Sequence, residues 1–325
     1  MKYSPVAHYS ARGGVYIERR LRKSTQFVVG GYAVVIGVVL LLANQGFNLG
    51  SSAQNVRTSS QQSRLVSQTT SGALAQPTAQ PVPQPDTQPN AQAATDTVEA
   101  SRLSAAVTAA KSQFATKQWS VAVYDLQSND WLLKDNAERQ YTSASLYKLY
   151  AVYGLAQKVP PSQWSTVTVA GRSLESCVDA MLRLSDNECG DAVGSYVGWS
   201  VIDRYIHAVG YNGTRLNRPA GPITTAQDTT QFMAALYQNK LFDASTTSRI
   251  LNSLQQQKYR QAIPAGCANC QTYNKTGNDN KVTHDSAIVT TGSRSYAVTI
   301  MSEDGGSYDQ IAAVERAIQS VVASQ

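Results

Sequence analysis

The sequence predicts a layered α/β domain, in which an antiparallel sheet is flanked by helices, together with an all-helical lobe. Alternating apolar residues, typical of strands, occur at residues 119–126 and again at 272–302, close to the C-terminus. Between these regions, residues 160–261 have mostly helical apolar spacing. Strands at both ends of a domain that enclose a helical block predict one sheet with a helical lobe beside it. We expect an active site in the cleft between the two, where pockets tend to form.

The elements of this domain follow one another from residue 99. Residues 99–117 carry apolar side chains at helical spacing, and residues 119–126 alternate as a strand. The turn Ser128-Asn129-Asp130 leads to a second strand at 131–133, and a largely apolar helix begins near Ser145. Later helices are expected at 174–184, 188–197, 201–209, 229–241 and 308–322, and later strands at 272–275, 285–291 and 295–302.

The first 24 residues carry most of the net charge of the chain. Six basic side chains against Glu18 give residues 1–24 a net charge of +5, whereas the whole chain of 325 residues has +6. A basic N-terminal tip on an otherwise nearly neutral chain argues against a nucleic-acid partner.

An apolar segment follows this tip and predicts a membrane anchor. Residues 27–43 are apolar apart from glycine and Tyr32. The length of this segment is near the lower limit for a helix that spans a bilayer. The basic residues before it place residues 1–24 in the cytoplasm and the rest of the chain outside the cell. We favour a retained single-pass anchor at 25–44, because Leu42-Ala43-Asn44-Gln45 is a poor cleavage site. The alternatives are a cleaved signal peptide and a buried helix.

A tether is expected between the anchor and the domain. Residues 45–98 are rich in Gln, Ser, Thr, Ala and Pro and have few large apolar side chains, so they cannot bury enough surface to become ordered. Residues 99–325 remain, which is enough for one large domain. The domain would therefore be held at the cell membrane, on its outer side.

Four cysteines in an extracellular domain predict disulfides. We expect Cys177 to pair with Cys189 and Cys267 with Cys270, since each pair brackets its own segment. A thioredoxin-like C-x-x-C motif lacks its strand-to-helix context here, and a zinc site lacks its ligand spacing. The three histidines lie far apart in the sequence, so we expect no metal site.

The stretch Ser143–Leu155 carries the first candidate active-site residues. The hydroxyl groups of Thr142 and Ser143 are expected to cap its helix. Ser145 and Lys148 stand three residues apart and therefore share one helical face. Desolvation lowers the pKa of a lysine, and a serine becomes nucleophilic beside such a base. Alone, however, an S-x-x-K tetrapeptide is expected by chance in almost any chain of this length.

Two further triplets follow, Ser185-Asp186-Asn187 and Lys275-Thr276-Gly277. Taken separately, the first is compatible with a simple helix cap and the second with a strand that ends in a turn. Together with S-x-x-K, in this order, they resemble the motif set of the serine β-lactamase and penicillin-binding protein superfamily, and most closely that of the class A β-lactamases. The resemblance covers about residues 99–325.

Three shorter segments are also similar to parts of this superfamily. Residues 213–218 resemble the entry to its active-site Ω-loop, and residues 228–230 resemble the exit. Residues 263–266 resemble the turn that precedes the K-T-G strand. The family pattern also implies an ion pair between Arg218 and Asp228 at the base of the loop.

The resemblance implies catalytic roles for four side chains. Ser145 would be the acylated nucleophile, and Lys148 would be its base or proton relay. Ser185 would pass the proton to the leaving nitrogen of the substrate. Lys275 would bridge toward Ser185 and keep the local electrostatic field positive.

Further residues would bind the substrate, which the resemblance implies is a β-lactam or a D-alanyl peptide of peptidoglycan. Asn187 would bind its amide, and Thr276 would bind its carboxylate together with the preceding lysine. Gly277 would let the strand approach the substrate closely. The backbone N–H groups of Ser145 and Asn278 would form the oxyanion hole. No cofactor is implied.

The loop itself departs from the family pattern. Class A enzymes place a glutamate there, which activates the water that clears the acyl-enzyme. Residues 219–227 contain no carboxylate, and the loop is several residues shorter. Since acylation does not need this loop if Lys148 is the base, efficient hydrolysis of β-lactams by that route is in doubt. The alternatives are a D,D-peptidase or transpeptidase, and a non-turnover β-lactam sensor or cell-wall-binding module.

The other polar residues near these motifs are expected to be structural. Arg183, Asp186 and Glu188 are interpreted as a solvated or structural charge set. His284 lies beyond the K-T-G strand, and we expect it on the surface.

Overall fold

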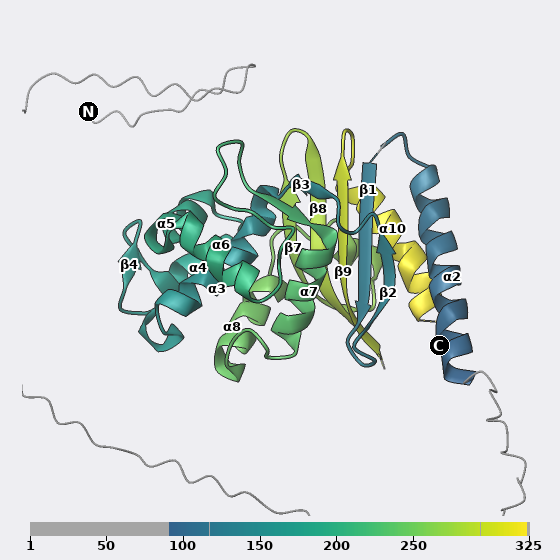
Figure 1. Cartoon of the computed structure of the whole chain (residues 1–325), viewed down its shortest axis with the longest axis horizontal. Helices are drawn as coiled ribbons and strands as arrows, with labels where there is room; N and C mark the ends of the chain where they lie inside the picture. The colour runs from purple at the N-terminus through teal and green to yellow at the C-terminus, as the bar shows by residue number, and fades with distance from the viewer. Residues whose placement is uncertain (1–90, 117, 293, 324–325) are drawn as a thin grey trace, which may run out of the picture. The chain divides into compact units, whose positions relative to one another are not determined.

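A computed structural model describes residues 91–116, 118–292 and 294–323 (Figure 1). The predicted cytoplasmic tip at 1–24 and the anchor at 25–44 lie outside the described residues, as does most of the tether at 45–98. Across the described part of the chain, no helix combines the length and the hydrophobicity that crossing a membrane requires.

A five-stranded antiparallel sheet forms the centre of the domain, with the strand order β2-β1-β9-β8-β7. The strands of this sheet are β1 (Gln118–Asp125), β2 (Asp130–Asp135), β7 (Gln271–Asn278), β8 (Val282–Thr291) and β9 (Arg294–Glu303). Strands from the two ends of the domain meet in the middle, where Val123 of β1 faces Val298 of β9. The fold class predicted from the sequence is therefore confirmed.

Two helices, α2 (Ala91–Ser112) and α10 (Tyr308–Val322), pack on each other and on one face of the sheet (Figure 1). Their buried side chains include Leu103 and Ile318, which join the valines of the sheet in one core. Helix α2 begins eight residues before the predicted domain boundary at residue 99, so residues 91–98 are helical and not part of a disordered tether. The run Ala91-Gln92-Ala93-Ala94 explains the difference, because alanine and glutamine are good helix formers.

The helical lobe lies on the opposite side (Figure 1). It contains α3 (Tyr147–Lys158), α4 (Leu174–Arg183), α5 (Asn187–Val197), α6 (Trp199–Ala208) and α8 (Ala244–Gln255), while α7 (Ala226–Tyr237) packs on β1, β8 and β9. Helix α3 is its central element, since every residue from Tyr147 to Leu155 is buried. Helix α8 was not among the expected helices, and it begins where Asp243 accepts a hydrogen bond from the backbone N–H of Thr246.

Several short elements connect these layers: β3 (Gln140–Thr142), η1 (Ala144–Leu146), η2 (Pro161–Gln163), β4 (Thr168–Val169), β5 (Arg172–Ser173), β6 (Ile223–Thr225) and α9 (Ile263–Gly266). The pairing of β3 with β6 matters most for the site, because it fixes the chain just before η1, on which Ser145 lies.

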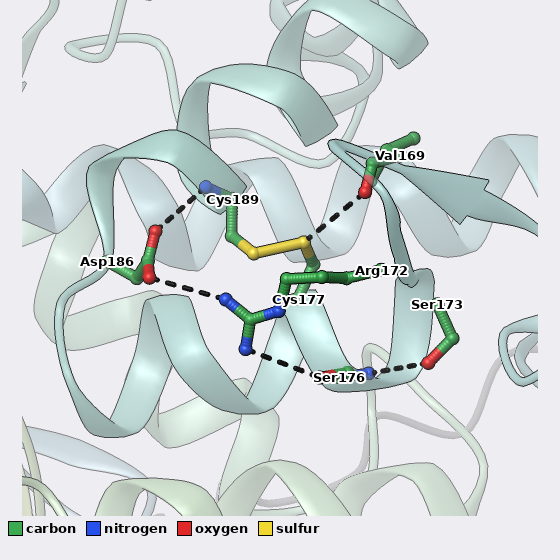
Figure 2. Close-up of a disulfide and its surroundings, with 7 residues drawn as sticks. All are labelled: Val169, Arg172, Ser173, Ser176, Cys177, Asp186 and Cys189. Atoms are coloured by element: carbon green, nitrogen blue, oxygen red, sulfur yellow. Dashed lines mark hydrogen bonds and ion pairs between the residues drawn. A yellow bond between two sulfur atoms is a disulfide. The ribbon is translucent and has the colours of Figure 1, made fainter. Parts of the chain in front are cut away.

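Both disulfides follow the expected pairing, Cys177 with Cys189 and Cys267 with Cys270. The first joins α4 to α5 and encloses the turn Ser185-Asp186-Asn187 (Figure 2). Asp186 caps α5 by accepting a hydrogen bond of 2.9 Å from the backbone N–H of Cys189. Figure 2 also shows Arg172 reaching Asp186, at 3.4 Å, beside the sulfur atoms.

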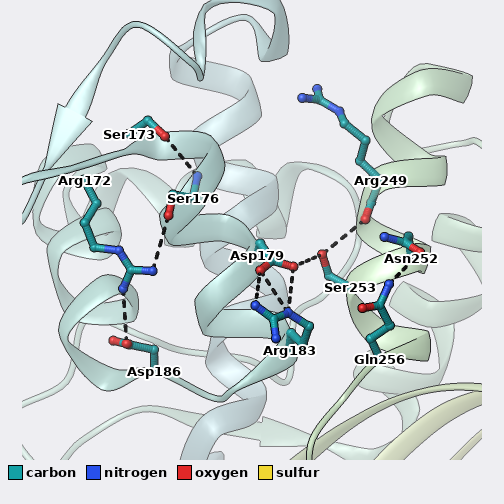
Figure 3. A network of polar contacts seen from close by, with 10 residues as sticks. All are labelled: Arg172, Ser173, Ser176, Asp179, Arg183, Asp186, Arg249, Asn252, Ser253 and Gln256. Carbon is teal, nitrogen blue, oxygen red and sulfur yellow. Dashed lines mark hydrogen bonds and ion pairs between the residues drawn. The ribbon is translucent and has the colours of Figure 1, made fainter.

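A polar network then ties α4 to α8 (Figure 3). Arg183 pairs with Asp179 at 2.8 Å, and the hydroxyl of Ser253 donates to the same carboxylate at 2.9 Å. Arg183 and Asp186 are thus structural charges, whereas Glu188 is exposed in the first turn of α5.

Removal of the Cys177–Cys189 disulfide is expected to destabilise the domain. A loop of 12 residues gains chain entropy in the unfolded state when the bond is absent, so replacing both cysteines by alanine should lower the free energy of unfolding by about 3 kcal/mol. The same change at Cys267 and Cys270, only three positions apart, should cost less. Denaturant unfolding of the full chain measures both, and an equal loss from the two pairs would contradict the loop-length argument.

Candidate active site

The turn that carries Ser145 is held by its neighbours and not by a side-chain cap. Thr142 and Ser143 were expected to cap the helix, but no side chain caps either η1 or α3. Instead, the backbone N–H of Ser143 donates to the carbonyl of Pro222 at 2.9 Å. Ala144 has a φ of 44°, a left-handed conformation that costs energy in a residue other than glycine. The surrounding structure therefore sets the position of Ser145.

His284 contacts the chain just before this turn and is buried, whereas we expected this histidine on the surface. Its side chain is fully buried, and its Nε2 lies 2.9 Å from the carbonyl of Thr142. Since the backbone N–H of Ser302 donates to Nδ1, the proton is on Nε2 and donates to Thr142. Burial lowers the pKa of His284 to about 4, so the ring is neutral. Its strand β8 lies within the sheet, between β7 and β9, which the sequence pattern did not reveal.

Lys148 lies on the first turn of α3 and is fully buried. Its amine donates to Ser145 Oγ at 2.9 Å, to the carbonyl of Ser185 at 2.8 Å and to Asn187 Oδ1 at 2.7 Å. Gly190 of α5 makes room for it, because an added Cβ would lie 2.7 Å from Lys148 Cε. The contacts with Ser185 and Asn187 thus hold the amine beside the hydroxyl of Ser145.

Burial also changes the proton affinity of this amine. Desolvation lowers the pKa of Lys148 to about 8, while Asp191 and Asp186 act in the opposite direction. An amine with this pKa is partly neutral near pH 7 and is able to take a proton from a hydroxyl 2.9 Å away.

The second lysine approaches the site from the edge strand β7. Lys275 is fully buried, and its amine donates to Ser185 Oγ at 2.8 Å and to the carbonyl of Thr276 at 2.7 Å. Burial, followed by the charge of Lys148, lowers the pKa of Lys275 well below its usual value. Ser185, with a φ of 59°, accepts from both lysines: from Lys148 through its carbonyl oxygen and from Lys275 through its hydroxyl.

Gly277 lets β7 lie against the serine turn. A Cβ at this position would be 2.9 Å from the carbonyl oxygen of Ser143 and 3.1 Å from the side chain of Leu146. The close approach places Thr276 and Asn278, on either side of the glycine, at the same cleft as Ser145.

The cleft has a volume of about 340 Å³. It is lined by Ser145, Ser185, Asn187, Tyr259, Thr276, Asn278 and Tyr308, and the amines of Lys148 and Lys275 lie against two of these hydroxyls. All eight residues expected from the motifs are therefore gathered in one region. Tyr259 and Tyr308 were missed, because nothing in the sequence distinguishes them from other tyrosines of this chain.

The short loop between residues 218 and 228 contributes no acidic group to the cleft, since none of the described lining residues is a carboxylate. Its expected ion pair is not formed. Arg218 is exposed and donates to the carbonyl of Gly221 at 3.4 Å, whereas Asp228 is buried and accepts from the hydroxyl of Thr214 at 2.8 Å. The hydroxyl of Thr214 and the backbone N–H groups of Gly213 and Thr214 satisfy this carboxylate without the arginine.

Comparison with known proteins agrees with this geometry. Residues 165–323 match the model of the β-lactamase enzyme family, a region that contains two of the three motifs. The matched region is similar to this enzyme family and covers just under half of the chain. The comparison with curated protein sequences finds no match.

Solved structures of β-lactamases and of PBP-A share the fold of this chain. A class A β-lactamase from Bacteroides cellulosilyticus DSM 14838 is 13% identical, with a TM-score of 0.61 over 70% of this chain and 99% of its own. A β-lactamase from Sphaerobacter thermophilus DSM 20745 is 17% identical, with a TM-score of 0.60 over 69% and 97%. The protein PBP-A is 16% identical, with a TM-score of 0.58 over 69% of this chain and 97% of its own.

The lowered pKa of Lys148 predicts how acylation should depend on pH. If the neutral amine is the base, the rate should rise about tenfold per pH unit below 8 and level off above it, because the neutral fraction does so. Stopped-flow acylation of the full chain by a fluorescent penicillin between pH 5.5 and 9 measures this profile. A rate that stays constant from pH 6 to 8 would show that the neutral amine of Lys148 is not required.

Proposed function

We propose that this protein is a membrane-tethered serine hydrolase whose domain lies outside the cytoplasm and forms an acyl-enzyme on Ser145. Its substrates are β-lactams or the D-alanyl peptides of peptidoglycan. The observation that carries the proposal is the contact of 2.9 Å between Lys148 Nζ and Ser145 Oγ, beside the contact of 2.8 Å between Lys275 Nζ and Ser185 Oγ. Two amines and two hydroxyls then surround one cleft.

The roles follow from the positions of these groups. Lys148 takes the proton of Ser145 as its oxygen attacks the carbonyl of the substrate. The hydroxyl of Ser185, which accepts a hydrogen bond from the amine of Lys275, then donates a proton to the leaving nitrogen of the substrate. The backbone N–H groups of Ser145 and Asn278 stabilise the oxyanion, a contribution of about 3 kcal/mol per donor.

Substrate binding uses the same cleft. The side chain of Asn187 is held by Lys148 at 2.7 Å through its carbonyl oxygen, which leaves its NH₂ group for the amide of the substrate. Thr276 and Lys275 receive the carboxylate, and Gly277 keeps the strand close to the serine turn.

The cleft supports acylation more readily than hydrolysis of the acyl-enzyme. A missing general base typically lowers the rate of the step that needs it by about 10²–10⁴. Since no carboxylate is among the described lining residues, the acyl-enzyme should persist. This favours a D,D-peptidase or transpeptidase, or a β-lactam sensor that does not turn over, above an efficient β-lactamase.

The tethering is inferred from the sequence. The basic residues before residue 25 and the apolar segment 27–43 are typical of a single-pass anchor with a cytoplasmic N-terminus. The disulfides Cys177–Cys189 and Cys267–Cys270 fit a domain in an oxidising compartment.

Acylation is tested by incubating the full chain, in detergent, with a fluorescent penicillin and measuring its intact mass. We expect one adduct in the wild type and in Ser200→Ala, which changes an exposed serine of α6, and none in Ser145→Ala. The lack of any adduct at high penicillin concentration would overturn the proposal. A rapid return to the unmodified mass would identify a β-lactamase.

A persistent adduct leaves peptidase and sensor to be separated. Release of D-alanine from a D-Ala-D-Ala peptide should be faster with the wild type than with Ser145→Ala if the protein is a peptidase. Equal rates would leave only a binding function.

A further inference from the structure

The end of the cleft next to Thr276 is built from neutral hydroxyl groups. None of the described residues that line the cleft carries a formal charge. The amine of Lys275, which lies beside the cleft, already donates to Ser185 Oγ and to the carbonyl of Thr276. An anionic group of a substrate at this end therefore needs donors in addition to this lysine.

Tyr308 is placed to be such a donor. It is the first residue of α10, which begins where Ser307 accepts a hydrogen bond from the backbone N–H of Gln310, and it lines the cleft with Tyr259. Its phenol and the side chain of Thr276 line the same cleft, close enough to interact. A threonine hydroxyl is able to donate to a phenol oxygen, and the phenol proton is then available to donate into the cleft.

The surroundings also keep this proton in place. Burial raises the pKa of Tyr308, and the negative charges that Asp285 and Tyr259 carry when ionised raise it further. The hydroxyl is thus a neutral donor throughout the physiological pH range. A hydrogen bond from a hydroxyl to a carboxylate is charge-assisted and about twice as strong as one between neutral groups.

We infer that Tyr308 is a substrate-binding residue whose hydroxyl, next to that of Thr276, binds the free carboxylate of the substrate. The inference rests on the proposed function and narrows it to substrates that present this carboxylate. Two elements distant in the sequence form the subsite, since Thr276 lies on β7 and Tyr308 on α10.

The test compares one ligand with and without its charge. Acylation rates of the full chain are measured over a range of concentrations with benzylpenicillin and with its methyl ester, for the wild type, Tyr308→Phe and Tyr237→Phe. Tyr237 is the matched control, because it lines a separate groove. Tyr308→Phe should raise the half-saturating concentration of the free acid about tenfold, with little change in its maximal rate of acylation. The half-saturating concentration of the ester should change less than twofold.

Each outcome bears on the inference. Equal losses for acid and ester in Tyr308→Phe would mean that the ring only shapes the cleft, and no loss for either would mean that its hydroxyl is not used. Both results overturn the inference while the acyl-enzyme proposal stands. Failure of the wild type to form an adduct with either compound would overturn both. Thermal unfolding of Tyr308→Phe identifies any loss that comes from misfolding.

Discussion

Replacement of Lys148 by methionine is expected to slow acylation of Ser145 by about 10²–10⁴, the usual contribution of a general base. Methionine is of similar length and apolar, so it fills the buried site while removing the amine that lies 2.9 Å from Ser145 Oγ. The carbonyl groups of Ser185 and Asn187 lose a donor, which should also lower the free energy of unfolding by about 1–3 kcal/mol. Stopped-flow acylation and denaturant unfolding measure the two effects.

The matched control is Lys158→Met in the last turn of the same helix. Lys158 is exposed and donates to the carbonyl of Tyr196, and neither residue lines the cleft, so its replacement should leave the acylation rate unchanged. If Lys148→Met acylates as fast as the wild type, another group must activate Ser145.

Replacement of Gly277 by alanine should lower the acylation rate about 100-fold. The new Cβ would lie 2.9 Å from the carbonyl oxygen of Ser143, and β7 cannot easily move away because it is paired with β8 along its whole length. The serine turn must therefore shift, and a displacement of about 1 Å can cost about 10² in rate. The free energy of unfolding should fall by about 1–3 kcal/mol, as in other overpacked sites.

Gly292→Ala separates activity from stability. Gly292 has a φ of 35° and open space around its Cβ position, so alanine there is strained without touching the cleft. It should lower stability by about 1–2 kcal/mol and leave acylation unchanged. If Gly277→Ala acylates at the wild-type rate, the close approach of β7 to the serine turn is not needed for the reaction.

Much of the fold was predictable because it depends on local patterns. The alternation of residues 119–126 and the helical spacing of residues 308–322 identify β1 and α10 whatever their partners are. The pairing of cysteines within two short segments was also correct, since short loops leave few alternatives.

The errors have a common cause. His284 was expected on the surface, Arg218 was expected to pair with Asp228, and Thr142 and Ser143 were expected to cap a helix. In each case the partner that decides the outcome comes from elsewhere in the chain: Thr142 and Ser302 for His284, Thr214 for Asp228 and Pro222 for the serine turn. No local pattern contains these contacts.

By itself, the sequence determined the fold class, the order of the elements and the residues that we propose for the chemistry, because periodicity and residue type are local properties of the chain. The tertiary structure alone decided how those groups behave. Full burial lowers the pKa of Lys148 to about 8 and directs its amine at Ser145. The same folding brings Tyr308 against Thr276, since α10 and the edge strand meet only when the sheet is complete. Desolvation and close packing are properties of the whole domain, and that is the physical reason why they cannot be derived from a motif.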